Sequence, residues 1–291
     1  MRHSGDIFHR IRQNKGLTAK EVAGDIVSPQ FLRKFETNVS DISFNNLLKL
    51  LVRMDTTMLE FISETGNALD VWLTAVEDEL DNAFNSGNSF LLKKFIEEND
   101  SQYAETGEKR FFLISLVGKQ YYDYSFPPVY HADTEPLLAH LRKIEQWGKF
   151  ELFLGTYMYF LFDDDEAYVY AMQLLKRRHP SADMNHWRND LALHFALKLI
   201  KNSKLGHAEK ILDIYFTNIA SQQQTHNIHF DLFARFVQGI LQMKDGHQQG
   251  AAQVEEILRI FHDVLGYVNY ANKLNALYIY FKTNDAACSD S

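Results

Sequence analysis

A short run near the amino terminus carries polar side chains that could contact nucleic acid. At helical spacing between apolar residues stand Ser28, Gln30, Arg33 and Lys34. The amide of Gln30 and the guanidinium of Arg33 can pair with base edges, while hydroxyl and ammonium groups suit phosphate oxygens. We therefore predict that Gln30 and Arg33 read bases and that Ser28 and Lys34 also contact DNA. A small helical bundle with a solvated polar face would show the same spacing and remains the alternative.

Two short helices must position these side chains. Thr18 and Glu21 have the spacing of a capping box, which predicts a helix over about residues 18–25. Ser28 followed by proline is typical of the start of the next helix. Two short helices joined by a tight turn let the second one lie in the major groove. The first turn of the earlier helix offers free N–H groups to an anion, so we predict phosphate contacts from Thr18 and Lys20.

Three further helices complete a predicted head over residues 1–65. Apolar residues recur at helical spacing from Gly5 until the pair Lys15-Gly16, which is typical of a helix end. Ser43 is expected to cap a fourth helix, and residues 55–62 are expected to form a fifth. The pattern predicts a five-helix domain that contains a helix-turn-helix.

Residues typical of catalysis and metal binding are present but form no recognisable set. Twelve histidines, among them His226 and His229, occur without an HExxH motif or a cysteine partner. The aspartates at 163–165 lack the loop pattern of a calcium site. The single cysteine, Cys288, stands in a polar tail and allows no intramolecular disulfide. Because no glycine-rich phosphate loop or GxSxG motif occurs either, we expect no enzyme activity, no metal and no cofactor.

Charge is distributed unevenly along the chain. The net charge is −8, whereas residues 1–65 carry nine Lys and Arg against eight Asp and Glu, so the acidic excess lies in the remainder. This argues against a protein that coats nucleic acid along its whole surface and favours a separate DNA-binding head. No apolar run approaches the length of a membrane span, and the amino terminus lacks the apolar centre of a secretory signal. We expect a cytoplasmic protein with no membrane partner.

The remainder of the chain shows a repeat of forty residues. Its copies open at Trp147, Trp187, Asn227 and Tyr267. Each copy has a helix and a polar break, and the first three add a second helix, a layout typical of a helical solenoid. In the third copy Gly239, Gly246 and Ala251 match the spacing of small residues in a tetratricopeptide repeat. We predict an all-α fold in which the head precedes a right-handed, tetratricopeptide-like solenoid.

A helix over residues 66–86 is expected to link the head to this body, since apolar residues recur there at helical spacing. Residues 87–291 then form a helical-repeat domain for ligand binding and dimerisation. The last copy ends after its first helix, from Tyr267 to Phe281, whose aromatic residues have no following helix to cover them. Because one small head makes few base contacts and two heads can read a two-part operator, we expect a homodimer joined through this helix.

The inner face of the first helices is where such solenoids bind ligands. Aligning the copies at three helical offsets predicts a ligand-binding stripe of Asn189, Phe195, His229, Leu232, Arg235, Asn272 and Asn275. Side-chain amides can bond a peptide main chain at both donor and acceptor, while Phe195 and Leu232 can contact apolar side chains. We therefore predict an extended peptide as the ligand. The alternative is that these residues merely face solvent.

The most specific pieces of the head are KGLTAKEVA, the run SPQFLRKFE and the DIS that follows. Over nearly all of residues 7–61 the sequence resembles the lambda-repressor-type helix-turn-helix of the Rgg/GadR/MutR regulators of Gram-positive bacteria. Many relatives have glutamine directly after the helix cap, where this chain has Ala19. This departure implies either weaker affinity for the DNA backbone or a contact supplied by Lys20.

The body resembles the same family in its layout and in the stretch FLFDDDEAYVYAMQLLKRR. In that family the repeat domain binds short secreted signalling peptides after their import, so the resemblance implies peptide control of DNA binding. The leading hypothesis is a homodimeric, sequence-specific regulator that binds double-stranded DNA and a short peptide. A helical-repeat scaffold for another protein, with a non-regulatory head, is the rival hypothesis. An enzyme is the weakest.

Overall fold

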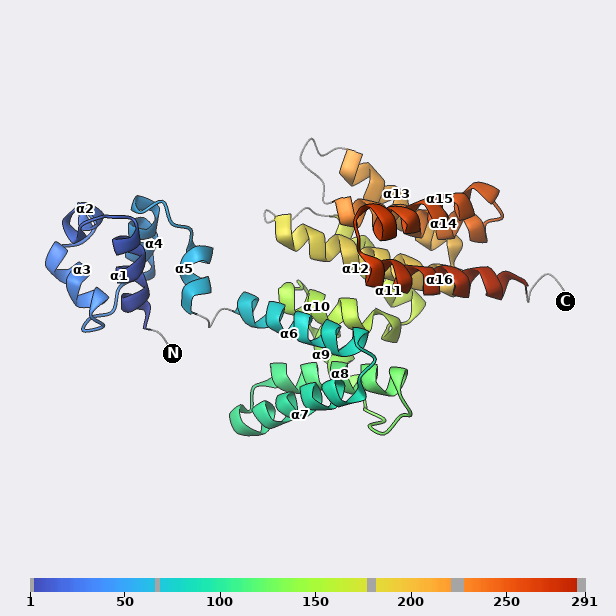
Figure 1. Cartoon of the computed structure of the whole chain (residues 1–291), viewed down its shortest axis with the longest axis horizontal. Helices are drawn as coiled ribbons and strands as arrows, with labels where there is room; N and C mark the ends of the chain where they lie inside the picture. The colour runs from blue at the N-terminus through green and yellow to red at the C-terminus, as the bar shows by residue number, and fades with distance from the viewer. Residues whose placement is uncertain (1–2, 66–68, 177–181, 221–227, 287–291) are drawn as a thin grey trace. The chain divides into compact units, whose positions relative to one another are not determined.

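The computed structural model describes residues 3–65, 69–176, 182–220 and 228–286. The chain divides into two compact units, Met1–Asp81 and Asn82–Ser291. Throughout the described ranges the regular structure is helical, with no strand (Figure 1). The predicted all-α class, with a helix-turn-helix head and a helical-repeat body, is confirmed. His226, Asn227 and Cys288 lie outside the described residues.

The head consists of five helices. They are α1 (Ser4–Asn14), α2 (Ala19–Ala23), α3 (Pro29–Glu36), α4 (Phe44–Arg53) and α5 (Met58–Thr65). The three predicted cap residues are confirmed: Thr18 accepts a hydrogen bond from the Glu21 N–H, and the hydroxyls of Ser28 and Ser43 cap α3 and α4 in the same way. The sequence therefore specifies these helix starts through local hydrogen bonds.

One apolar core joins these helices. Its buried members are Ile7, Phe8, Ala19, Val22, Ala23, Leu32, Phe35, Leu50, Leu51, Met54 and Phe61. The rings of Phe8 and Phe35 meet edge to face at 5.5 Å between centroids, which joins α1 to α3. At Gly5 the two helices approach so closely that a Cβ atom would lie 2.0 Å from the Phe35 carbonyl oxygen. Glycine at this position is therefore a packing requirement.

A longer helix, α6 (Leu69–Asn85), follows the head. The sequence predicts a linking helix over residues 66–86, and the division between the two compact units falls inside α6, after Asp81.

Over the ranges that the structure describes, ten further helices build the repeat domain. They are α7 (Ser89–Thr106), α8 (Lys109–Ser125), α9 (Glu135–Lys143), α10 (Lys149–Met158), α11 (Asp164–Lys176), α12 (Ala182–Lys201), α13 (Leu205–Ala220), α14 (Ile228–Lys244), α15 (Gln248–Arg259) and α16 (Val268–Ala286). A 3-10 turn over Tyr159–Leu161 extends α10, and a π-helical turn over Ile260–Val264 extends α15.

Neighbouring helices of this domain pack as hairpins, which then stack. Figure 1 shows α7 beside α8 and α14 beside α15, and these two pairs are among the most extensive helix contacts. Helix α12 packs on α10, α11, α13 and α14, so it lies at the centre of the stack. Because each hairpin covers its apolar face with the next one, the core is continuous along the domain.

Helices α14 and α15 cross closely at two glycines. A Cβ atom at Gly239 would lie 2.8 Å from Val254 Cγ2, and one at Gly250 would lie 2.5 Å from the Gly239 carbonyl oxygen. Gly246 has a φ of +84° in the turn between the helices. Gly239 and Gly250 thus occupy positions that require a small residue, whereas the positive φ of Gly246 favours glycine in the turn.

Candidate nucleic-acid interface and ligand face

Side-chain hydrogen bonds cap the starts of both α2 and α3. At the start of α2, the Thr18 N–H donates to Glu21 Oε2 at 2.7 Å and the Glu21 N–H donates to Thr18 Oγ1 at 3.2 Å. At the start of α3, the Phe31 N–H donates to Ser28 Oγ at 3.1 Å. The hydrogen bonds from the Thr18 hydroxyl and main-chain N–H lower the pKa of the Glu21 carboxyl. The two helices of the motif are therefore fixed locally before any partner is bound.

Arg53 of α4 secures the end of α2. Its Nη1 atom donates to the carbonyl oxygens of Val22 and Ala23 at 3.4 and 3.2 Å, and its Nη2 atom lies 2.5 Å from Asp25 Oδ1. The intervening Gly24 has a φ of +45°, and a Cβ atom there would lie 1.8 Å from Arg53 Nη1. The backbone conformation thus favours glycine in this turn, and a side chain there would also displace the Arg53 guanidinium.

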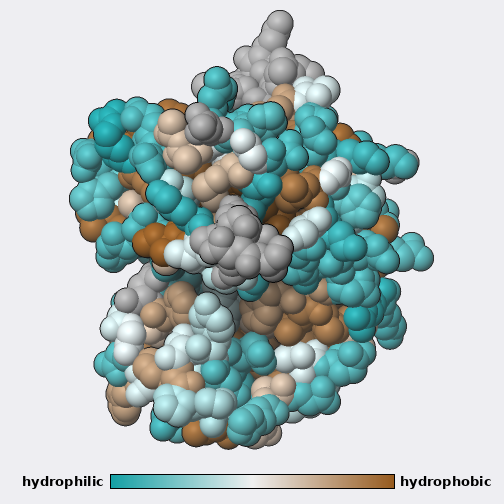
Figure 2. Space-filling view, turned by 90° about the vertical axis from the view of Figure 1, so that its right-hand side faces the viewer, coloured by the Kyte–Doolittle hydropathy of each residue, from teal (hydrophilic) through white to brown (hydrophobic). Residues whose placement is uncertain are grey.

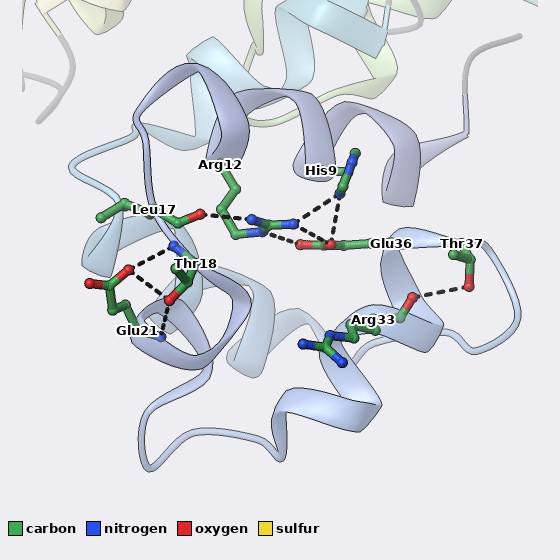
Figure 3. Close-up of polar contacts among 8 residues, drawn as sticks. All are labelled: His9, Arg12, Leu17, Thr18, Glu21, Arg33, Glu36 and Thr37. Atoms are coloured by element: carbon green, nitrogen blue, oxygen red, sulfur yellow. Dashed lines mark hydrogen bonds and ion pairs between the residues drawn. The ribbon is translucent and has the colours of Figure 1, made fainter.

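A buried ion pair joins α1 to α3 (Figure 3). Arg12 donates from Nε to Glu36 Oε1 at 2.6 Å and from Nη2 to Oε2 at 2.7 Å. Arg12 Nη1 also donates to the Leu17 carbonyl oxygen at 2.7 Å, and His9 Nδ1 lies 2.8 Å from Glu36 Oε2. This network connects α1, the residue before the α2 cap and the last residue of α3, so it sets the position of both helices of the motif.

The electrostatics of this network favour its charged form. Burial alone would raise the pKa of the Glu36 carboxyl, but the hydrogen bonds and charges of Arg12 and His9 outweigh burial and lower it. The hydrogen bond to Glu36 raises the pKa of Arg12. Glu36 is therefore ionised near neutral pH, and the bidentate pair is formed.

The predicted DNA-contact residues all lie on the surface of this framework. Thr18, Lys20, Ser28, Gln30, Arg33 and Lys34 are exposed. In Figure 3 the Arg33 guanidinium lies apart from the network of His9, Arg12 and Glu36. The hydroxyls of Thr18 and Ser28 already act as helix caps, whereas Gln30, Arg33 and Lys34 extend from α3. The geometry presents two cations and an amide on one short helix.

Sequence reasoning missed the residues that hold the motif in place. Arg12, Glu36 and Arg53 act through charge pairs or carbonyl contacts between residues far apart in the chain. The signal available was a charged residue inside an apolar helical pattern, as at Arg12, but a single sequence does not show which residue it pairs with.

The seven predicted ligand residues do not form one stripe. Phe195 is fully buried, and its ring meets Phe162 edge to face at 5.3 Å, so it belongs to the core and its predicted contact with a peptide was wrong. Arg235 is exposed, but its guanidinium lies over the Phe216 ring of α13 and its carbonyl oxygen accepts a hydrogen bond from Gln253 of α15. It therefore faces the second helices of the hairpins.

On α16, the predicted Asn272 and Asn275 share an exposed stripe with Val268 and Ile279. Ring contacts to α14 instead come from Tyr270, whose centroid lies 4.6 Å from that of His229. Asn272 and Asn275 thus point away from the side of α16 that meets His229.

Asn189, His229 and Leu232 are half-buried on the neighbouring helices α12 and α14. The residues that connect the first helices across this region are aromatic or imidazole rings. Tyr159 meets His194 at 5.1 Å, and His194 meets Phe233 at 5.2 Å between centroids.

The forty-residue alignment failed because the repeat is not uniform. Tyr159, after α10, contacts His194 of α12, and these two residues are separated by fewer than forty positions in the sequence. Rings that meet between later helices are separated by close to forty positions. A fixed offset therefore selects different helix faces in different copies. The position directly after Asn189 and its counterparts, which holds Asp190, Phe230 and Tyr270, would have been a better guide to the side where the helices meet.

The described ranges lack the features of a membrane-spanning helix and of a metal site. No helix there is long and apolar enough to cross a membrane. Within the same ranges, no three His, Cys, Asp or Glu residues gather in a way that could hold a metal ion.

Comparison with known proteins gives matches along nearly the whole chain. The family model described as the C-terminal domain of the HTH-type transcriptional regulator Rgg matches residues 91–276, and a helix-turn-helix model matches residues 8–61. The first match alone covers more than half of the sequence.

Solved structures share the fold. The SHP pheromone receptor Rgg2 of Streptococcus dysgalactiae has a TM-score of 0.77 at 20% identity, covering 95% of this chain and 99% of its own. A transcriptional regulator from Listeria monocytogenes EGD-e, described as putative, gives 0.75 at 16%, covering 98% and 99%. A complex of PrgX with cCF10 gives 0.71 at 16%, covering 97% and 93%.

Proposed function

Because the chain belongs to the Rgg family of helix-turn-helix transcriptional regulators, we propose that it binds operator DNA through α2 and α3 under the control of a short peptide. The DNA-binding part of this proposal rests on the exposed cationic and amide side chains of α3. The Arg12–Glu36 pair holds α3 in place, and Arg53 holds the end of α2. The peptide half is supported by the shared fold with a structure described as a pheromone receptor and with one described as a peptide pheromone/receptor complex.

Within the head, Gln30 and Arg33 are proposed to contact base edges. Gln can bond adenine and Arg can bond guanine in a bidentate manner in the major groove. Lys20, Lys34, Thr18 and Ser28 are proposed to contact phosphates, with the two hydroxyls acting while they cap their helices. The acidic excess lies outside residues 1–65, so the heads are proposed to carry the affinity for DNA.

The active form is proposed to be a cytoplasmic homodimer, because two heads can read two half-sites. Exposed apolar side chains at the carboxyl-terminal end of the repeat domain supply a surface for it: Val264, Tyr267, Val268, Ile279 and Tyr280. Hydrophobic patches also interrupt the mainly hydrophilic face in Figure 2. Phe281 and Tyr278 are buried within the chain, so the proposed interface includes only the exposed side of α16.

Substitution on α3 tests the DNA half. We expect Gln30→Ala or Arg33→Ala to weaken binding to DNA upstream of the gene about tenfold or more and to relax base preference at one operator position. Lys34→Ala should weaken binding to all sequences and reduce its salt dependence. Gln13→Ala, at an exposed position on α1, is the matched control. Unchanged binding in the α3 variants would contradict the proposal and favour the protein scaffold.

A further inference from the structure

Asp190 lies on α12, the helix that packs on α10, α11, α13 and α14. In α12 its carboxylate Oδ2 lies 3.6 Å from Nδ1 of His194, and the same nitrogen lies 2.9 Å from the Asp190 carbonyl oxygen. Burial first and the charge of Asp190 second raise the pKa of Tyr270 in α16. Burial, then the charges of Asp231 and Asp190, raise the pKa of Tyr215 in α13. Helix α12 meets α14 where the His194 centroid lies 5.2 Å from that of Phe233, and α14 meets α16 where the His229 centroid lies 4.6 Å from that of Tyr270.

The Asp190 carboxylate lacks a permanent cationic partner. Within the described parts of the chain, no lysine or arginine contacts it. The groups whose positive charge acts on it are the imidazoles of His194 and His229. The side chain is only 20% exposed. Burial raises the pKa of Asp190 against the influence of the two histidines, and burial lowers the pKa of His229. A carboxylate in such a place is stabilised most by a cation that a ligand brings.

Aromatic rings surround the same region. The His229 centroid lies 4.6 Å from that of Tyr270 and 5.4 Å from that of Phe261, while His186 stacks on Phe230 at 5.4 Å. Faces of aromatic rings attract ammonium groups. Apolar rings also exclude water, which strengthens a nearby ion pair. A carboxylate beside such rings is a chemical match for a protonated amine.

We propose that Asp190 binds a protonated amine of the peptide ligand. This inference rests on the proposed function, since it assumes that a peptide binds in the repeat domain, and it assigns the group that the site recognises. The amine is either the amino terminus of the peptide or a lysine side chain, which share the same chemistry. His229 and Tyr270 form the aromatic side of the site.

Matched synthetic peptides test this assignment on the full chain. The probe is a panel of short peptides of Leu, Ile, Val and Phe, each made with a free and with an acetylated amino terminus, plus an acetylated set that contains one lysine. Binding is measured by titration calorimetry. On the unmodified protein we expect the loss of every amine to weaken binding about tenfold or more. Recovery of affinity in the lysine set would identify the side chain, and its absence would identify the amino terminus.

Two isosteric variants complete the experiment. Asp190→Asn should reduce the affinity for amine-bearing peptides to that of the acetylated ones and leave the acetylated peptides unaffected, while Asp213→Asn, at an exposed position on α13, should change neither. Equal affinity of free and acetylated peptides for the unmodified protein would overturn the assignment of Asp190 while leaving the proposed function intact. Equal weakening of both by Asp190→Asn would do the same. If no peptide in the panel binds, the proposed function and this inference are both contradicted.

Discussion

Arg12 and Glu36 face each other across the head in two parallel hydrogen bonds of 2.6 and 2.7 Å, with the Glu36 side chain only 3% exposed. Arg12 belongs to the third turn of α1, whereas Glu36 is the last residue of α3. The pair therefore fixes the position of α3, the helix that carries Gln30 and Arg33, relative to α1.

Removing one partner of this pair should destabilise the head. We expect Glu36→Gln to lower the free energy of unfolding by about 3 kcal/mol, because it leaves the buried Arg12 guanidinium without a negatively charged partner. The single substitution Arg12→Lys should also lower the free energy of unfolding, since an ammonium cannot make the bidentate contact. Chemical denaturation measures both. Arg10→Ala, which removes the exposed pair with Glu64, is the matched control and should cost less than about 1 kcal/mol. A loss in Glu36→Gln no larger than in that control would show that the pair does not support the fold.

The same pair makes the stability of the head depend on pH in the acid range. The pKa of Glu36 is lowered in the folded state, so its contribution is present above the unfolded value of about 4.3 and is lost as the pH falls through the lower folded value. Thermal unfolding from pH 6 to pH 3 should show a decline in Tm that is smaller in Glu36→Gln, which cannot titrate. Parallel declines in the two proteins would mean that other carboxyls account for the effect.

Gly5 should tolerate no side chain. Gly5→Ala places a methyl group against the Phe35 carbonyl oxygen, which must move α1 away from α3, and we expect a loss of about 2 kcal/mol in the free energy of unfolding. The control is Gly206→Ala in α13, where nothing lies within 4 Å of the added carbon and stability should rise slightly. Calorimetry of both variants gives the comparison, and an unchanged Tm in Gly5→Ala would show that the approach of α1 to α3 is looser than described.

Dimerisation through α16 predicts sensitivity to charge on its exposed stripe. The double variant Val268→Glu and Ile279→Glu should shift the protein towards the monomer in analytical ultracentrifugation, because two carboxylates cannot be buried unpaired in an apolar interface. Val169→Glu, at a similarly exposed valine of α11, should leave the association unchanged. A stable dimer in the double variant would place the interface elsewhere.

Local signals in the sequence predicted the head more successfully than the body. Thr18, Ser28 and Ser43 determine helix starts through contacts within three residues, so a single sequence suffices to find them. The ligand face depends on which residues meet across helices, and Phe195 shows how a helical offset that ignores packing can select a core residue. Asp190 was missed for the same reason, since the rings of its region meet across helices.

The central claim is that a peptide bound by the repeat domain changes DNA binding by the head. The most direct measurement is the affinity of the full chain for DNA upstream of its gene, by fluorescence anisotropy at fixed salt, with and without saturating short apolar peptides. The account predicts that at least one peptide changes this affinity by about fivefold or more, as expected for coupled sites, and that Arg33→Ala weakens DNA binding about tenfold or more in both conditions. DNA affinity that stays the same while a peptide is shown to be bound would contradict it.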